Sequence, residues 1–400
     1  MADSTKKLIM ESDPAYIDFG LFAPRGIDKF VIVDSIFGFF PYIEMHLLDG
    51  MGYMADTLPM IDNMKFFTVL KDLENKKELK NTYALTTYQL QGRTSAEYLS
   101  GVSILGFIDS NHLRNLPVSK IFKDRNMKSA IEELIKVYEL NGKFISDNIR
   151  NKGDWKCFNY IPSEYLQLLS EKAVARDNPK FPYYCFSNAK KEFYFMNILE
   201  LMNQQPVHTF DMAFSKDQLI NDKKIQSYIF IQNGALDNFY TFHQKGFYVN
   251  EKGDFSNSEE KITDHIPKTG SKNILNIFKT DLDPIRTYDD LGIQDKESYT
   301  GLRNADARDA VLNNRMYIVC HYNPDLVSGK TVNVKVGSYE EGQGKNNFVV
   351  SGKYVILESR HSYANHRGTN VDLPMTQILI GKPTINISDK NRLYPDLVKI

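Results

Sequence analysis

His361 and His366 are the closest pair among the eight histidines of this chain. The two lie five residues apart across a predicted hairpin turn, which does not match the spacing of metal ligands on a helix or a strand. The loop 342–345 (GQGK) has the glycines and the lysine of a phosphate loop, yet the motif is incomplete and no predicted helix follows it. Neither segment therefore predicts a metal or phosphate site.

Neighbouring carboxylates are frequent, as at Glu132 and Glu133 or Asp289 and Asp290, in a chain with 50 acidic residues. A glycosidase needs two carboxylates that face each other across a cleft, and adjacency in sequence does not establish this. No Gly-x-Ser-x-Gly motif for a nucleophilic serine occurs. We therefore predict no catalytic residue, no cofactor-binding residue, no metal ligand and no cofactor, which favours a structural or binding role.

The three cysteines, Cys157, Cys185 and Cys320, are scattered and odd in number. This pattern argues against a disulfide framework and against a structural zinc site. Free cysteine is usually buried and behaves as a small apolar residue, so all three are expected in the core.

The composition excludes several classes of partner. The 49 basic and 50 acidic residues give a formal net charge of −1, so no overall charge attracts nucleic acid or an anionic membrane. The apolar run 31–43 is interrupted by polar residues, glycine and proline, and is shorter than the roughly 20 residues that span a bilayer. The basic N-terminus lacks the apolar block of a secretory signal, so we expect folding in a cytoplasm.

A long hairpin near the C-terminus has the clearest pattern in the chain. It is predicted from two strands, 348–363 and 371–381, joined by the loop 364–370. Apolar Val355, Leu357 and Tyr363 alternate with polar residues, although Ile356 interrupts the alternation, as expected for a half-buried antiparallel strand. The hairpin predicts a β-barrel or sandwich at this end of the chain, with Gly352 and Tyr354 at a barrel corner.

The first 115 residues or so are also predicted to be mostly strand. Runs rich in β-branched and aromatic residues occur at 29–35, 41–48, 65–71, 82–91 and 101–109. Strands at this regular spacing without intervening helices favour an antiparallel barrel or sandwich over a doubly wound α/β sheet.

The pattern changes between residues 116 and 210. Ile131, Leu134, Ile135 and Tyr138 recur at helical spacing, with a stop expected at Asn141–Gly142. A second helix is expected from Ser163, as a capping residue after Pro162.

Two aromatic strands, 182–187 and 192–197, follow the second helix. Their aromatic residues are expected to pack under the helices, the alternative being a stacking platform for bases or sugars, and the residues concerned are Tyr183, Phe186, Phe193 and Phe195.

Strands are expected again at 225–232, 245–251, 316–322 and 331–336. A helix is expected at 299–314, and the polar segment 255–298 is predicted to be an extended arm or a mobile insertion, because it is too long for an ordinary loop.

Three stretches carry a resemblance to a known family. They are 34–62, with EMHLLDG at 44–50 and LPMI at 58–61; 121–195, with Trp155, NYIPS at 159–163 and PYYCF at 182–186; and 326–361, with LVSGK at 326–330, VNV at 332–334 and SGKY at 351–354. In order and spacing these stretches resemble the central baseplate hub proteins of contractile phage tails, a superfamily with late control D proteins and the hub domains of type VI secretion spikes. The segment 255–298 has no counterpart in that pattern.

The resemblance implies a mainly β fold with an α+β part, in which two similar antiparallel β-barrels flank a small mixed α+β module. The expected domains are a first β-barrel domain at 1–115, the α+β module at 116–210, a second β-barrel domain at 211–385 with a polar insertion near 255–298, and a C-terminal tail at 386–400.

The resemblance also implies a function, that of a homotrimeric, pseudo-sixfold adaptor that joins a hexameric tail tube to a trimeric cell-puncturing spike and leaves a channel for DNA. The expected partners are two further copies of the chain, a spike protein, a tail tube or tube-initiator protein and other baseplate proteins. DNA is expected only in transit, and no membrane insertion by this chain is expected. Because the last predicted strand is soon followed by Ile400, the spike is expected to be a separate chain.

The expected location is the tail tip of a virion, after synthesis in the host cytoplasm. The small net charge suits a channel that DNA passes without sticking, because a basic lining would hold phosphate. The alternative is a tail-associated hydrolase or a glycan-binding module that uses the aromatic middle domain.

Overall fold

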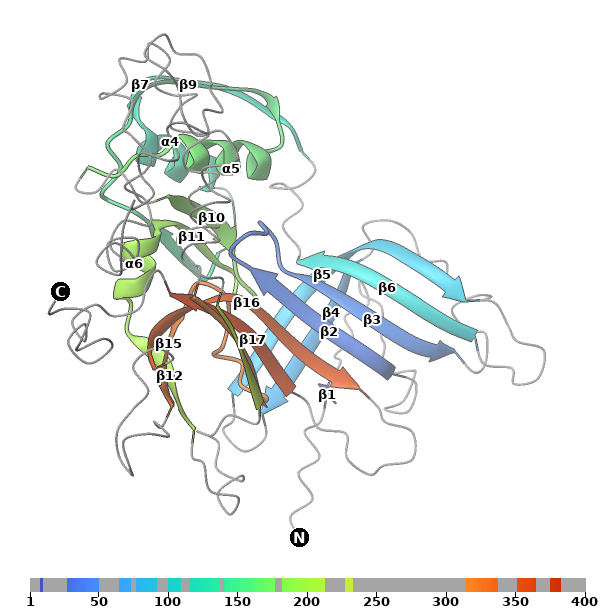
Figure 1. Cartoon of the computed structure of the whole chain (residues 1–400). Helices are drawn as coiled ribbons and strands as arrows, with labels where there is room; N and C mark the ends of the chain where they lie inside the picture. The colour runs from blue at the N-terminus through green and yellow to red at the C-terminus, as the bar shows by residue number, and fades with distance from the viewer. Residues whose placement is uncertain are drawn as a thin grey trace, which may run out of the picture.

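The computed structural model describes residues 8–9, 27–49, 65–72, 77–91, 100–108, 116–136, 138, 140–176, 182–212, 227–232, 314–336, 351–364 and 375–382. This part of the chain is mainly β with a small α+β portion, which confirms the predicted fold class. Figure 1 shows a large sheet below and the α+β portion above it.

Six strands near the N-terminus form the first repeat. They are β1 (Leu8–Ile9), β2 (Ile27–Ser35), β3 (Tyr42–Asp49), β4 (Lys65–Asp72), β5 (Lys77–Gln91) and β6 (Ser100–Ile108). Their hydrogen-bonded order is β1-β4-β5-β6-β3-β2, and all of these pairs are antiparallel. Alternating apolar residues, such as Phe30 and Ile32 of β2, face a buried core.

Six strands from the second half of the chain form the second repeat. They are β12 (Pro206–Met212), β13 (Ser227–Gln232), β14 (Asn314–His321), β15 (Thr331–Val336), β16 (Gly352–Ala364) and β17 (Met375–Lys382). Their order is β12-β15-β16-β17-β14-β13, and only β12 and β15 pair in parallel. The predicted hairpin is confirmed as β16 and β17.

The two repeats have the same strand connectivity. When the strands of each repeat are numbered one to six along the chain, both sheets have the order 1-4-5-6-3-2. Within each repeat the fifth strand has a β-bulge against the sixth, between Leu85 and Thr87 in β5 and between Ile356 and Glu358 in β16. The second repeat therefore has the strand order of the first, with one difference: β12 runs parallel to β15, whereas β1 runs antiparallel to β4.

The repeats join into one twelve-stranded sheet through β2 and β16, which pair antiparallel from Ser35↔Glu358 to Lys29↔Ala364. One edge of β16 pairs with β17. The other edge pairs first with β15, over residues 352–355, and then with β2, over residues 358–364. β16 is therefore the strand shared by both repeats.

The middle module lies between the repeats in sequence. It contains β7 (Val118–Asn126), α4 (Met127–Leu134), β8 (Gly142–Ile145), β9 (Lys152–Tyr160), α5 (Pro162–Lys172), β10 (Tyr183–Ser187), β11 (Glu192–Asn197) and α6 (Ile198–Asn203). The β7–β9 ribbon curves over α4 and α5, and the three-stranded sheet β10-β11-β8 lies beneath these helices (Figure 1).

The two long helices of the middle module begin and end differently from the sequence pattern. α4 starts after Asn126, whose side chain caps Lys128 N, but it ends at Leu134 and not at Asn141–Gly142. Gly142 begins β8 instead.

α5 has Ile161 at its N-cap and Pro162 at its first position, with no side-chain cap, so the predicted capping role of Ser163 is wrong. Proline at the first position needs no N–H partner, which explains why the helix starts one residue earlier than predicted.

The aromatic strands pack in two directions. Tyr183, Phe193 and Phe195 are buried with the helices, as predicted. Phe186 is equally buried but lies on the other face of β10, because strand residues alternate between faces, and it stacks on Tyr194 with ring centroids 5.0 Å apart. None of the four predicted residues is therefore exposed as a stacking platform.

All three cysteines are free and buried, as predicted. Several other predictions fall outside the described residues: His366, the loop 342–345, Asp289 and Asp290, the strand 245–251, the segment 255–298, the helix over 299–313 and the tail 386–400.

Candidate functional site: a buried joint between the repeats

Asp34 lies near the end of β2 with 1% of its surface exposed. Its carboxylate accepts hydrogen bonds from the backbone N–H of Ala189 at 2.8 Å, from the backbone N–H of Ser328 at 3.2 Å and from the hydroxyl of Ser359. Ala189 belongs to the middle module, Ser328 to the loop before β15, and Ser359 to β16. One carboxylate therefore ties the first repeat to the middle module and to the second repeat.

The turn that carries Ala189 is shaped by Asn188. The side-chain oxygen of Asn188 accepts from Lys190 N at 3.0 Å and from Glu192 N at 3.1 Å, a local bonding pattern typical of asparagine in turns. The carbonyl of Ala189 accepts from the Asn81 side chain of β5 at 2.7 Å. Both polar backbone groups of Ala189 are therefore held by the first repeat.

Two ion pairs fix the same turn to the loop before β15. Lys190 contacts Asp325 at 2.5 Å, and Lys330 contacts Glu192 at 2.9 Å. Lys330 also lies 5.7 Å from the ring centroid of Tyr194. All four charged side chains are partly buried, so solvent screens these contacts less than it screens a surface pair.

The point where β16 leaves β15 is bridged by backbone hydrogen bonds. Gly329 N donates to Ile356 O at 2.9 Å, Ile356 N donates to Lys330 O at 2.8 Å, and Ile36 N donates to Leu357 O at 2.9 Å. We call the point at which the neighbour of β16 changes from β15 to β2 the fork. The loop before β15 lies at this fork and is hydrogen-bonded to β16.

His361 lies two residues beyond Ser359 and is fully buried. Its Nε2 lies 3.4 Å from Ser359 Oγ, its Nδ1 lies 3.1 Å from Thr376 Oγ1, and its ring meets Tyr322 edge-on. Asp34, Ser359 and His361 are the residue types of a hydrolytic triad. Here, however, the hydroxyl lies between carboxylate and imidazole, whereas a triad places the imidazole in the middle. All three residues are buried, and their contacts link β2 to β16.

Burial acts on the two titratable groups in opposite senses. It raises the pKa of Asp34 to about 6 despite the hydrogen bonds to the carboxylate, which act to lower it. It also lowers the pKa of His361 to about 3, and the positive charge of Lys190 acts in the same direction. The folded chain therefore holds His361 neutral at neutral pH.

His361→Gln is expected to change how stability depends on pH. Below pH 6.5 the unfolded chain protonates His361 while the folded chain does not until about pH 3, so the stability contribution of the histidine is lost as the pH falls. From pH 7 to pH 5 the free energy of unfolding of the wild type should fall by about 2 kcal/mol more than that of the variant. Urea unfolding of both proteins at both pH values measures this. If the wild type and the variant differ in free energy of unfolding by the same amount at pH 7 and pH 5, His361 is not a buried neutral histidine.

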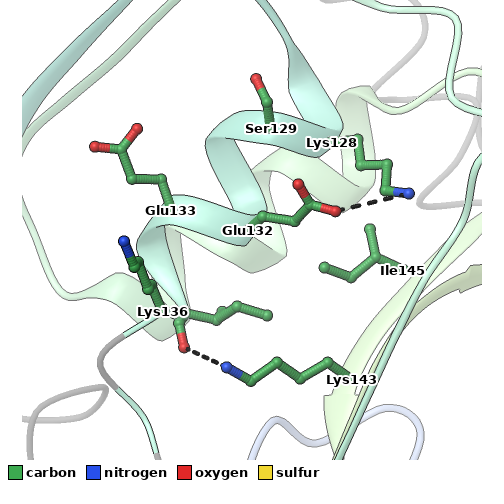
Figure 2. A pocket seen from close by; sticks show the side chains of 8 residues that line it. Lys128, Ser129, Glu132, Glu133, Lys136, Lys143 and Ile145 are labelled. Atoms are coloured by element: carbon green, nitrogen blue, oxygen red, sulfur yellow. Dashed lines mark hydrogen bonds and ion pairs between the residues drawn. The ribbon is translucent and has the colours of Figure 1, made fainter.

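A second feature is a shallow hollow of about 550 Å³ beside α4. Figure 2 shows Lys128 beside Glu132, and their Nζ and Oε1 atoms lie 3.6 Å apart. Lys143 Nζ donates to the Ile135 carbonyl at 3.4 Å. Glu133 pairs with Lys120 and Arg125. Glu132 and Glu133 therefore already have basic partners at the surface.

Within the described ranges, no three His, Cys, Asp or Glu side chains gather in an arrangement that could hold a metal ion. The described helices also include none with the length and hydropathy needed to cross a bilayer.

Sequence reasoning did not single out Asp34, Ser359 or Ala189. A signal was present, because Asp34 follows Phe30 and Ile32 at alternate positions of one strand and so shares their buried face. Ser359 and His361 likewise alternate with the apolar residues Val355 and Leu357 of the predicted hairpin.

No protein-family model and no curated protein matches the chain. Among solved structures, a 43 kDa tail protein of prophage MuSo2 from Shewanella oneidensis has a TM-score of 0.53 at 9% identity, covering 94% of this chain and 98% of that one. A tail protein from Neisseria meningitidis MC58 has a TM-score of 0.49 at 10% identity, covering 90% and 93%. A type VI secretion component from E. coli has a TM-score of 0.45 at 8% identity, covering 94% and 76%. The Shewanella likeness shows a shared fold over nearly the whole chain.

Proposed function

We propose that this chain is a structural hub of a phage tail baseplate, without enzymatic activity. Three copies form a ring of six similar repeats, which joins a hexameric tail tube to a trimeric spike. The observation that carries this proposal is the repeated strand order within one chain. A protein with two equivalent repeats presents sixfold-like contacts on one side while it remains a threefold assembly on the other.

The shared fold with a prophage tail protein supports the proposal, as does the resemblance in order and spacing to baseplate hubs. The joint supports it as well, because an adaptor needs a fixed angle between its repeats, and Asp34 fixes both to the middle module. The chain acts at the tail tip of the virion, with a separate spike chain, a tube or tube-initiator protein and other baseplate proteins as partners. DNA passes through the central channel without being bound. The predicted domain boundaries at 115 and 385 are part of this proposal, and the boundary predicted at 210 is proposed to lie before β12, at Pro206.

The oligomeric state tests the proposal directly. Light scattering of the purified full chain, alone and mixed with the spike protein of the same tail, is expected to give a particle that contains three times the 46.1 kDa of one chain. Electron microscopy of that particle should show a ring with a central opening. A chain that stays monomeric under both conditions and binds neither spike nor tube protein would refute the hub.

A further inference from the structure

The three-stranded sheet of the middle module has an open edge at β8. Its strand order is β10-β11-β8, so β8 has a neighbour on one side only among the described strands. Ser146, directly after β8, donates its N–H to the Phe195 carbonyl of β11 at 2.9 Å. Because successive residues of a strand direct their backbone groups to opposite sides, Phe144 also faces β11, whereas Lys143 and Ile145 direct their N–H and C=O groups to the open edge. Unpaired backbone groups of this kind are a template for a further strand.

The hollow beside α4 lies along this open edge. The strand residues that line it, Lys143 and Ile145, both belong to β8, and its other lining residues belong to α4 and the two residues that follow it. Figure 2 shows both side chains reaching from β8 toward the helix. None of the described residues of β10 and β11 lines the hollow. A strand added to β8 would therefore place alternate side chains in this hollow.

The opposite face of the same sheet has a row of three aromatic rings, one from each strand. Phe186 of β10 stacks on Tyr194 of β11 with ring centroids 5.0 Å apart, and Tyr194 stacks on Phe144 of β8 at 4.8 Å. Phe186 and Tyr194 are fully buried, whereas Phe144 at the open edge is 39% exposed. Aromatic residues on neighbouring strands stabilise a sheet, so a fourth strand with an aromatic residue beside Phe144 would extend the row.

The hollow has an excess of positive charge. Three lysines and two glutamates line it, and Glu133 already contacts Lys120 and Arg125. Lys143 donates one of its three N–H groups to the Ile135 carbonyl, at 3.4 Å, which leaves N–H groups that can donate to a carboxylate. The lining therefore favours an acidic side chain over a basic one.

We propose that β8 is a docking site for an extended segment of a partner protein, which adds to the open edge as a fourth strand. The segment has an aromatic residue beside Phe144 on one face of the sheet. Acidic residues on either side of this aromatic residue reach into the hollow on the other face, because neighbouring residues of a strand point to opposite faces. The site belongs to the middle module of one copy, so it does not depend on the proposed ring.

Binding of a synthetic peptide to the full chain tests the site. The probe is the fluorescein-labelled peptide TETEYETET, blocked at both ends, and fluorescence anisotropy at physiological salt measures its dissociation constant. A peptide with lysine in place of every glutamate and a peptide with serine in place of the tyrosine are each expected to bind about tenfold more weakly. Absence of saturable binding of the probe, or equal affinity for the probe and the lysine peptide, would overturn the proposal.

Two variants of the chain locate the bound peptide. Lys143→Glu is expected to weaken binding of the probe about tenfold, whereas the matched control Lys156→Glu, on the exposed face of β9, should bind as the wild type does. Equal weakening by both would show attraction by overall charge and overturn the hollow as the site. Phe144→Leu keeps an apolar side chain without the ring, so it should lose most of the preference for the tyrosine peptide over the serine peptide. An unchanged preference would overturn the contact with Phe144.

Hydrogen exchange, resolved at single residues, tests strand addition itself. The N–H groups of Lys143 and Ile145 face the open edge, so they are expected to exchange rapidly in the free chain and at least about tenfold more slowly with saturating probe. The N–H of Phe144 faces β11 and is the internal reference, which should be protected in both states. Bound probe with unchanged exchange at Lys143 and Ile145 would overturn the fourth strand.

Discussion

Asp34→Ala is expected to lower the free energy of unfolding by about 3 kcal/mol at pH 5, since each buried donor left without an acceptor costs about 1–3 kcal/mol. The donors are the backbone N–H groups of Ala189 and Ser328 and the hydroxyl of Ser359, all fully or almost fully buried. Alanine offers none of them an oxygen. Without these three hydrogen bonds, the contacts of the repeats with the middle module should break before the hydrophobic cores unfold.

The deficit of Asp34→Ala is expected to depend on pH. Because the folded-state pKa of Asp34 is raised to about 6, its contribution to stability is full below the unfolded value of 3.8 and is lost as the pH rises through 6. The deficit should therefore shrink by about 1 kcal/mol from pH 5 to pH 7. Urea unfolding at both pH values, with intrinsic fluorescence of Trp155 in the middle module as one probe, measures both quantities.

Asp147→Ala is the matched control, since it removes an aspartate that is 91% exposed and ion-paired to Lys128. An exposed pair contributes at most about 1 kcal/mol, so this variant should unfold nearly as the wild type does. Equal losses for the two variants would contradict the role of Asp34 as the buried acceptor of the joint, and a deficit of Asp34→Ala that grows with pH would contradict the raised pKa of Asp34.

The joint has a consequence for the proposed ring. Strand pairing alone leaves the twist between β2 and β16 free to vary, because neighbouring strands of a sheet differ in direction by roughly 10° to 35°. Asp34 and the Ala189 turn add contacts outside the plane of the sheet, and Tyr322 of the second repeat donates to the Leu70 carbonyl of β4 at 3.1 Å. The angle between repeats is therefore set by side chains and the middle module together.

Local patterns in the sequence were sufficient for most strands of the two repeats. The predicted strand 331–336 coincides with β15, and the terminal hairpin is β16 with β17. Alternation of apolar and polar residues reports on the burial of one strand face, which is a property of the strand itself. The three cysteines were placed in the core by a different argument, the usual burial of free cysteine, and all three are buried.

Pairing between distant strands was not predictable from such patterns. β2 and β16 are separated by more than 300 residues, and the residues of each strand do not indicate which strand it pairs with. The β7–β9 ribbon was missed for another reason. Most of its residues are exposed, so its strands lack the alternation of apolar and polar residues that indicates a half-buried strand. Asp34 was overlooked because an acidic residue after an apolar run resembles the end of a strand, whereas here it is the buried centre of the joint.

Gly329→Ala is expected to destabilise the chain by about 3 kcal/mol, the sum of a backbone and a packing term. Gly329 has a φ of +80°, and an added Cβ would lie 2.4 Å from the ring of Phe186. Its N–H donates to Ile356 O at 2.9 Å and its carbonyl accepts from Gln204 Nε2 at 2.8 Å, so the backbone cannot move away without breaking the fork. Thermal or urea unfolding measures the loss.

Gly153→Ala is the control, because a Cβ at Gly153 meets no atom within 4 Å, and it should change stability by less than about 0.5 kcal/mol. A double-mutant cycle with Phe186→Leu separates the two terms. Leucine is smaller than phenylalanine, so the combined loss should fall short of the sum of the single losses by about 1 kcal/mol. Strictly additive losses would mean that Phe186 does not restrict position 329, and that the cost of Gly329→Ala comes from the backbone angle alone.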